Sequence, residues 1–316
     1  KNKDVSIVTE RPYQFPKPGT KALRRRPVII GSGPAGLFCC YMLAQNGYRP
    51  ILLERGKDVE ARKKDVEAFW NGGPLNPESN VSFGEGGAGT FSDGKLNTLI
   101  KDKDGRGRHV LSIFVENGAQ PEILYDAKPH IGTDVLSNVV KQMRKKIIQL
   151  GGEVRFESRV ETFRTENGAL TGVILSDGSV IDTETAVLAI GHSARDTFFK
   201  LYESGLHMEA IAVGLRVEHP QELINQSQYG TLHPDSLGAA PYKVTARTSG
   251  GRGVYSFCMC PGGYVVNASS EPGRIAVNGM SYSSRDGRNA NSAIIVSVTP
   301  EDFGAEGPLA GIAFQR

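Results

Sequence analysis

Three glycines and one glutamate are spaced as in a site that binds a dinucleotide. Gly31, Gly33 and Gly36 fit the pattern G-x-G-x-x-G, and Glu54 lies 18 residues after Gly36. In this pattern the first glycine permits a tight turn, the second lets a pyrophosphate approach the backbone, and the third lets a helix pack closely on the preceding strand. The N–H groups at the start of that helix attract phosphate. The spacing predicts dinucleotide binding; the alternative is a glycine-rich strand–helix turn without a ligand.

The elements around these residues form one βαβ unit. Apolar runs at 27–30 and 51–53 predict two buried strands, and helical spacing of apolar residues predicts a helix over 34–46 between them. Glu54 ends the second strand, where a carboxylate can accept the hydroxyls of a ribose and would repel a 2′-phosphate. This argues against NADP, but the fingerprint alone does not choose between NAD and FAD.

A glycine-rich stretch and a group of short strands follow. Residues 71–98 have no periodicity, and long loops of this kind are commonly functional. Helices are expected over 58–70, 106–117 and 133–150, the last with Thr133 or Asp134 as its N-cap. Short strands within 153–181 predict a small meander. The apolar run 186–190, which ends at Gly191, predicts another buried strand of the parallel sheet.

The order of these motifs resembles a known group of flavoproteins. The segments VIIGSGPAGLFCCYMLAQNG, LLERG, GGAGTFSDGKLNT, AIGHSARD, GLRVEHP and SFCMCPGGYVV together resemble the uncharacterised bacterial FAD-dependent dehydrogenases of the glutathione-reductase-like superfamily. That family is distantly similar to the geranylgeranyl-reductase and aminoacetone-oxidase-like flavoproteins. The resemblance covers about residues 27–316 and implies non-covalent FAD, but it names no substrate.

The resemblance also implies which residues contact the cofactor. The fingerprint would hold the pyrophosphate, the loop from Gly86 to Lys95 would lie along the pyrophosphate and flavin, and Val160 would contact the adenine through its backbone. Lys95 could counter a phosphate or flavin anion; the alternative is a solvated loop lysine. The expected cofactor-binding residues are Gly31, Ser32, Gly33, Pro34, Ala35, Gly36, Glu54, Arg55, Gly86, Gly87, Ala88, Gly89, Ser92, Lys95, Val160 and Gly191.

Three side chains are candidates for catalysis. His192 follows Gly191 at a strand end and could exchange a proton; the alternative is a local hydrogen-bonding role. Cys258 and Cys260 would face the same side of a strand and could exchange electrons with a flavin, or they are small packing residues. Cys39 and Cys40 are expected in the core, and no spacing of histidine, cysteine and carboxylate predicts a metal site.

The sequence divides into an arm and two domains. Residues 1–26 are expected to be an extended arm, 27–206 a Rossmann-like FAD-binding α/β domain, and 207–316 a mainly β substrate or cap domain inserted into it. The motif that returns the chain to the FAD domain in such flavoproteins is not found in 300–316. The sequence is therefore expected to end before the FAD site is complete, with FAD absent or weakly held.

Composition limits the partners. The 37 basic and 34 acidic residues leave a net charge of +3, which by itself predicts neither nucleic acid nor an anionic membrane as a partner. No apolar run approaches the ~20 residues of a membrane span, and the four cysteines form no disulfide framework, so a cytoplasmic location is expected. Glycine supplies 38 of 316 residues, about 12% against roughly 7% in average proteins.

These observations predict an FAD-dependent oxidoreductase that transfers hydride between FAD and a small-molecule substrate. No second G-x-G-x-x-G is present, so NAD(P)H is expected to bind transiently as electron donor or to be replaced by another donor. One alternative is a flavin- or dinucleotide-binding protein without turnover. The other is a flavin-dependent RNA-modifying enzyme, with 24–26, three consecutive arginines, as a small basic contact.

Overall fold

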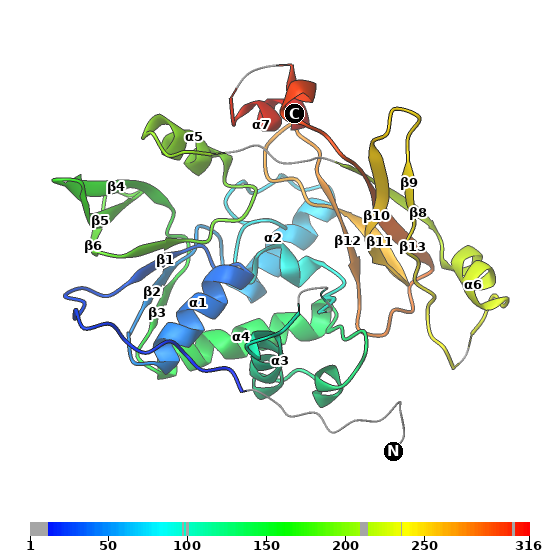
Figure 1. The fold of residues 1–316 in the computed structure, drawn as a ribbon, viewed down its shortest axis with the longest axis horizontal. Helices are drawn as coiled ribbons and strands as arrows, with labels where there is room; N and C mark the ends of the chain where they lie inside the picture. Colours follow the sequence, from blue (N-terminus) through cyan, green and yellow to red (C-terminus); the bar gives the residue numbers. More distant parts are fainter. Residues whose placement is uncertain (1–11, 97, 99–100, 209–213, 235, 305–306) are drawn as a thin grey trace.

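A four-stranded parallel sheet forms the centre of the first part of the chain. The computed structural model describes residues 12–96, 98, 101–208, 214–234, 236–304 and 307–316. The sheet has the order β3-β2-β1-β7, and every neighbouring pair is parallel. Figure 1 labels three of its strands, β1, β2 and β3. Its strands are β1 (Val28–Ile30), β2 (Ile51–Leu53), β3 (Glu153–Arg155) and β7 (Ala186–Leu188). The predicted α/β class with a Rossmann-like first part is confirmed.

The two central strands alternate their side chains between two cores. Ile29 and Leu52 point into one cluster of buried apolar residues, whereas Val28 and Ile30 point into another on the opposite face. Because neighbouring residues of a strand face opposite ways, a continuous apolar run marks a strand that is covered on both sides. This is why the two short runs in the sequence could be predicted as buried strands.

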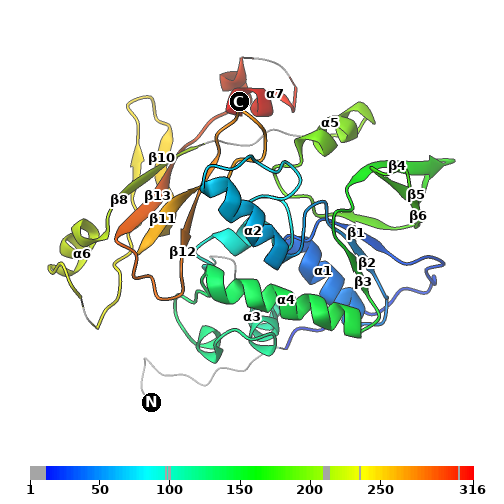
Figure 2. The same ribbon diagram turned by 180° about the vertical axis from the view of Figure 1, so that it is seen from behind.

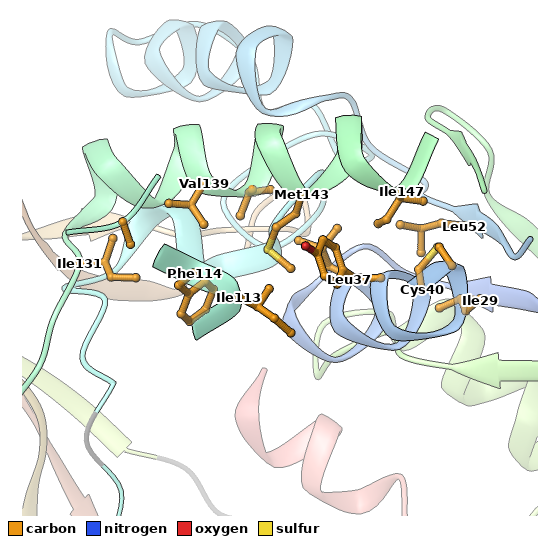
Figure 3. Close-up of a cluster of buried hydrophobic side chains, with 14 of the residues drawn as sticks. Ile29, Leu37, Cys40, Leu52, Ile113, Phe114, Ile131, Val139, Met143 and Ile147 are labelled. Carbon is orange, nitrogen blue, oxygen red and sulfur yellow. The ribbon is translucent and has the colours of Figure 1, made fainter. Parts of the chain in front are cut away.

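Three helices cover the first face: α1 (Pro34–Gln45), α3 (Arg106–Glu116) and α4 (Thr133–Gln149). In Figure 3, Met143 and Ile147 of α4 point toward Leu37 and Cys40 of α1. Cys40 is fully buried in this cluster, and Cys39 is half-buried against it, so the predicted packing role of both thiols is confirmed.

An antiparallel meander covers the second face. It consists of β4 (Val160–Glu166), β5 (Ala169–Leu175) and β6 (Val180–Asp182), in the order β4-β5-β6. The sequence placed the strand at 153–157 within this meander, which is wrong. That strand is β3, and it pairs in parallel with β2.

The strand β7 is less buried than its apolar run predicts. Its residues are half-buried or exposed, and Leu188 is 41% exposed. Leu188 lines a cavity at this edge of the sheet instead of a packed core. An apolar run does not by itself distinguish a covered strand from one that borders an apolar cavity.

The second part of the chain is mainly β, as predicted. A four-stranded antiparallel sheet has the order β8-β13-β10-β9. The strands β11 and β12 form a separate hairpin, which lies beside this sheet in Figure 1 and in Figure 2. The strands are β8 (Gly214–Pro220), β9 (Thr245–Arg247), β10 (Gly253–Cys260), β11 (Gly263–Asn267), β12 (Val277–Ser281) and β13 (Asn289–Val296). The sequence did not predict the helices α5 (Arg195–Glu203), α6 (Gln221–Tyr229) and α7 (Ala310–Gln315). The exact boundaries of the predicted domains stay a prediction.

Polar contacts join the two parts. The indole Nε1 of Trp70, the last residue of α2 (Val59–Trp70), donates to the Asn267 carbonyl oxygen at 2.8 Å. The Arg285 guanidinium forms an ion pair with the buried Asp93 carboxylate, with 2.9 Å between Nε and Oδ1. These contacts fix the hairpin side of the second part against the loop that follows α2.

The start of α4 takes part in the same junction. Gly132 is the N-cap, with φ of 77°, whereas the sequence predicted Thr133 or Asp134. Asp134 does not cap the helix with its side chain. Its carboxylate accepts from the Ser283 amide at 3.1 Å and from the Ser283 hydroxyl at 2.8 Å, so this side chain links the two parts.

The described part of the arm, 12–26, contains no helix or strand. Arg26 donates to the Glu153 carboxylate at 2.7 Å and to the Pro50 carbonyl oxygen at 3.2 Å, which holds the end of the arm against the edge of the parallel sheet.

Adjacent isoleucines near the end of α4 provide a test of this packing. Ile147 is fully buried, whereas Ile148 is 51% exposed. We expect Ile147→Ala to lower the free energy of unfolding by about 2–5 kcal/mol, because it leaves a cavity in the core. Ile148→Ala, the matched control, should change it by no more than about 0.5 kcal/mol. Denaturant unfolding of both variants measures this, and equal losses would contradict the assigned core.

Candidate dinucleotide-binding site

Two fingerprint glycines are required by close backbone packing. At Gly31, which has φ of 100°, a Cβ atom would lie 2.4 Å from the carbonyl oxygen of Ala189, the residue that follows β7. At Gly36 it would lie 1.8 Å from the Gly31 carbonyl oxygen. These distances are far below van der Waals contact, so both residues must be glycine for β1, α1 and the end of β7 to meet.

Two other glycines face open space. A Cβ atom added to Gly33 or to Gly191 would have no atom within 4 Å, and both residues line the same cavity. Gly33 has φ of −65°, a conformation open to any residue, so its backbone does not require glycine. A bare backbone that borders a cavity allows a ligand to approach closely.

The cavity has a volume of about 740 Å³, within the range of cofactor and ligand sites. It lies at the carboxyl ends of β1 and β2, where ligands bind in open parallel sheets. The predicted site residues that line it are Gly31, Gly33, Pro34, Ala35, Glu54, Arg55, Gly87, Ala88, Gly89, Val160, Gly191 and His192. Five predicted cofactor-binding residues do not line it: Ser32, Gly36, Gly86, Ser92 and Lys95.

Glu54 holds the backbone around the cavity. Its side chain is buried, and one carboxylate oxygen accepts from the Ser32 amide at 2.8 Å and from the Ser32 hydroxyl at 2.7 Å. The other oxygen accepts from the amides of Gly56 and Gly84, both at 2.9 Å. Because a carboxylate has about four acceptor positions, these bonds occupy all of them. Ribose binding by Glu54 stays a prediction, and it requires one of these donors to give way.

The sequence analysis missed Arg62, which organises the opposite wall. Its guanidinium is fully buried, and Nε donates to the Asn80 carbonyl oxygen at 2.8 Å. The other four N–H groups bond to the carbonyl oxygens of Val81, Glu85 and Gly87 and to the Thr90 hydroxyl. Burial lowers the pKa of Arg62 to about 10, with the nearby charges of Glu54 and Glu85 opposing the shift, so the group stays cationic at neutral pH.

One sequence signal could have identified Arg62. The buried residues of α2 are Val59, Arg62 and Val66, so the arginine occupies a position on the apolar stripe of a charged helix. A cation there must be paired internally. The signal does not reveal that its partners are the carbonyl groups of the glycine-rich loop.

Ion pairs surround the rim of the cavity near the end of β2. Arg55 donates from Nε to Glu78 at 2.8 Å and from Nη1 to Asp196 at 2.9 Å. Its guanidinium also lies 4.3 Å from the centre of the Phe83 ring. Arg159 forms a further ion pair with Glu78 at 3.2 Å. The rim therefore presents both charges, with Arg55 committed to protein partners.

The three catalytic candidates lie in different places. His192 lines the cavity, and its Nδ1 lies 2.8 Å from the Ser193 hydroxyl oxygen. Cys258 and Cys260 do not line it. The sequence predicted them on one side of a regular strand, but the pairing register of β10 shifts between Phe257 and Cys260, and Cys258 has φ of 50°. An irregular backbone therefore sets the directions of the two thiols.

Lys95 lies at the far end of the glycine-rich loop from the cavity. Its ammonium group is 3.3 Å from the Asp93 carboxylate, and its backbone forms a bridge with His130. Contact with a flavin or phosphate stays a prediction for this residue.

The described ranges contain neither a cluster of metal ligands nor a membrane-spanning helix. No three histidine, cysteine or carboxylate side chains there are grouped as metal ligands. In the same ranges no helix has the length and apolar character needed to cross a membrane.

Two family models match the chain. Residues 29–74 match the NAD(P)-binding Rossmann-like domain, and residues 210–316 match the model described as FAD-dependent protein, C-terminal domain-like. The first match contains the fingerprint and Glu54, and the second begins near the change from the α/β part to the β part.

One curated relative is an uncharacterised protein of Clostridium beijerinckii. It is 52% identical over 319 residues, which cover the whole of this chain and 59% of the relative. The chain therefore spans about three fifths of the length of the curated relative it matches.

Some solved structures resemble the chain at low identity and low TM-score. One is the THI4 protein of Thermovibrio ammonificans, with 18% identity, a TM-score of 0.40, and coverage of 60% of this chain and 66% of that one. Another is 2-methyl-3-hydroxypyridine-5-carboxylic acid oxygenase, with 12% identity, a TM-score of 0.38, and coverage of 92% and 65%. At these values the likeness says nothing of activity.

The resemblance that the motifs predicted is thus confirmed: the chain is similar to an uncharacterised FAD-dependent family, with a Rossmann-like dinucleotide-binding part followed by a C-terminal part of the FAD-dependent type.

Proposed function

We propose that this chain binds FAD in the cavity at the end of β1 and forms the cofactor-binding part of an oxidoreductase. The observation that carries the proposal is the difference between the glycines. Gly31 and Gly36 are fixed by backbone packing, whereas Gly33 and Gly191 leave open space along the cavity wall. Packing accounts for the first pair, and the left-handed φ of 66° at Gly191 favours glycine there by itself. Gly33 has neither reason, and a ligand that touches its backbone accounts for it.

The residues present fit a dinucleotide. The helix α1 begins at Pro34, and its N-cap Gly33 has no side chain that could satisfy the first N–H groups. These groups and the positive end of the helix dipole would hold the pyrophosphate. On the opposite wall, Gly87 approaches so closely that a Cβ atom there would lie 3.1 Å from the Gly33 Cα atom. Val160 and Arg55 would border the adenosine end, and Gly191 the flavin side.

The choice of FAD over NAD rests on the second part of the chain. The match of residues 210–316 to an FAD-dependent C-terminal domain supports FAD, and the sequence contains no second dinucleotide fingerprint. NAD(P)H would then be a transient electron donor. An oxidoreductase with a small-molecule substrate remains the best-supported function, and a binding protein without turnover is the alternative that kinetics would identify.

Bound FAD would supply hydride transfer to or from a substrate. The chain would position the substrate against the flavin, exclude water from the cavity, and exchange a proton with the substrate. Leu188, Phe198 and Leu201 contribute apolar surface to the cavity. We assign proton exchange to Nε2 of His192, because Nδ1 is engaged with Ser193.

The RNA-modifying alternative gains no support from the arginines. Within the described arm, Arg26 pairs with Glu153, and Arg25 lies 4.0 Å from Asp182. Arg24 and Arg25 are exposed, but three arginines are a small footprint for a phosphate backbone.

Cofactor binding can be measured directly. We expect titration with the chain to quench FAD fluorescence, with the weak affinity that the sequence predicts. NAD⁺ at the same concentration should displace little of the FAD. Reduction of the bound flavin by NADH under anaerobic conditions would then separate an enzyme from a binding protein. Failure of FAD to bind, with the chain shown to be folded by circular dichroism, would refute the proposal.

The glycine difference gives a second test. Gly33→Val should weaken FAD binding about tenfold or more, because its side chain would enter the cavity. The free energy of unfolding should fall by no more than about 1 kcal/mol, the cost of a poor N-cap residue. Gly36→Ala should lower the free energy of unfolding by about 1–3 kcal/mol through overpacking. Gly19→Val is the matched control, since its Cβ also meets nothing within 4 Å but Gly19 does not line the cavity. Normal FAD binding by Gly33→Val would contradict the assigned site.

A further inference from the structure

The two cysteines of β10 form a close pair outside the cofactor cavity. The Cys260 thiol lies 3.3 Å from the Cys258 carbonyl oxygen, and the interaction between the two thiols shifts the pKa of both. The bulge after Phe257 and the left-handed conformation of Cys258, with φ of 50°, produce this arrangement. A cysteine with positive φ is uncommon, so this local conformation needs support from its surroundings.

Cations from two other elements approach the pair. The Nη1 atom of Arg216, on β8, is 3.1 Å from the Cys258 carbonyl oxygen and 4.0 Å from the Cys260 sulfur. Gly279 leaves the space for this guanidinium, since a Cβ atom there would lie 2.1 Å from Nη1. Lys95, from the glycine-rich loop, also acts on both thiols through its charge, and Asp93 beside it is the nearby anion.

These surroundings make the two thiols unequal. The hydrogen bond from Cys260 lowers the pKa of Cys258 to about 6 against the opposing effect of burial, and the charges of Lys95 and Arg216 add to the lowering. The same hydrogen bond and burial raise the pKa of Cys260. Cys258 is half-buried and Cys260 fully buried. One thiol is therefore poised as a thiolate with some access, and its neighbour holds the proton.

The other cysteines provide an internal comparison. Cys39 is half-buried like Cys258, but burial raises its pKa. Burial also raises the pKa of Cys40 to about 12. Packing thiols in an apolar helix interface are inert, whereas a thiolate beside cations is nucleophilic.

We propose that Cys258 and Cys260 are a dithiol–disulfide pair that exchanges with a small-molecule disulfide. The Cys258 thiolate attacks one sulfur of that disulfide, which forms a mixed disulfide and releases the first thiolate, protonated by solvent. Cys260 then loses its proton to solvent and attacks the Cys258 sulfur. This forms the Cys258–Cys260 bond and releases the second thiolate, so one disulfide is reduced to two thiols as the pair is oxidised.

The proposal does not depend on bound FAD, so it can fail or hold independently of the proposed function. Its rival is that both residues only fill space in the bulge. In that case Cys258 would react like Cys39, and a mixed disulfide on it would persist.

Reaction of the chain with dithiodipyridine at pH 6 distinguishes the two. At this pH about half of a thiol with a pKa of about 6 is thiolate. After allowance for its lower intrinsic nucleophilicity, we expect Cys258 to react about tenfold faster than an ordinary thiol. The fast phase should release two equivalents of thiopyridone. Mass spectrometry should show a protein lighter by two hydrogens, with residues 258 and 260 linked.

Variants assign the roles. Cys260→Ser should release one equivalent and retain a pyridyl adduct on Cys258, and Cys258→Ser should lose the fast phase. Cys39→Ser, the matched control, should keep both equivalents. Lys95→Met should slow the fast phase at pH 6 and much less at pH 9, where ordinary thiols also ionise. A persistent adduct on Cys258 in the unmodified chain, or a rate no faster than that of Cys39, would overturn the proposal; both measurements use the unmodified chain and so do not depend on how the variants fold.

Discussion

The buried guanidinium of Arg62 is the interaction on which the cavity wall depends. A guanidinium has five N–H donors, and a charge buried without partners is very costly. Here all five find acceptors in the glycine-rich loop: four carbonyl oxygens and the Thr90 hydroxyl. The cation therefore acts as a template around which 80–90 takes its shape. Gly84, with φ of 118°, must be glycine there because a Cβ atom would lie 2.4 Å from the Arg62 side chain.

Glu54 is the anionic counterpart. It accepts two bonds from Ser32 in the fingerprint turn, and one each from Gly56 and Gly84. Arg62 thus shapes the loop, and Glu54 fastens that loop to the end of β1 and β2. The two opposite charges support each other, since the charge of Glu54 favours the cationic form of Arg62. The glutamate at the end of the second strand therefore has a structural role in joining these segments, in addition to the predicted role in binding a ribose.

The sequence predicted those features that local pattern determines. The buried strands β1 and β2, the helix α1 and the glycine turn between them follow from apolar runs, helical spacing and a motif within about 28 residues. The cavity-lining residues Gly31, Gly33, Pro34 and Ala35 followed with them. Features set by distant segments were missed. The sequence placed Gly86 and Lys95 at the cofactor, but neither of these two residues lines the cavity. The loop that carries them is shaped by contacts to Arg62 and Asp93.

The same reason explains the cysteines and the unpredicted helices. A regular strand would place Cys258 and Cys260 on one side, but the bulge depends on pairing with β13 and on Arg216 from β8. The helices α5 and α6 have nine residues each and bury only one and two of them, so little of either helix belongs to a core. The sequence of one segment does not show which distant segments will pack against it, so conformations that depend on such packing cannot be deduced from it.

The glycine-rich loop connects the cofactor cavity with the surroundings of the Cys258–Cys260 pair. Its first half, from Gly87 to Gly89, lines the cavity, and its second half carries Asp93 and Lys95 toward the thiol pair. The Asp93 carboxylate is almost fully buried and is held by Arg285 from the second part, so the second half is fixed from that side while Arg62 fixes the first. Both halves are therefore anchored by buried charges. The charge of Lys95, which lowers the pKa of Cys258, is thus held in place through its ion pair with the buried Asp93.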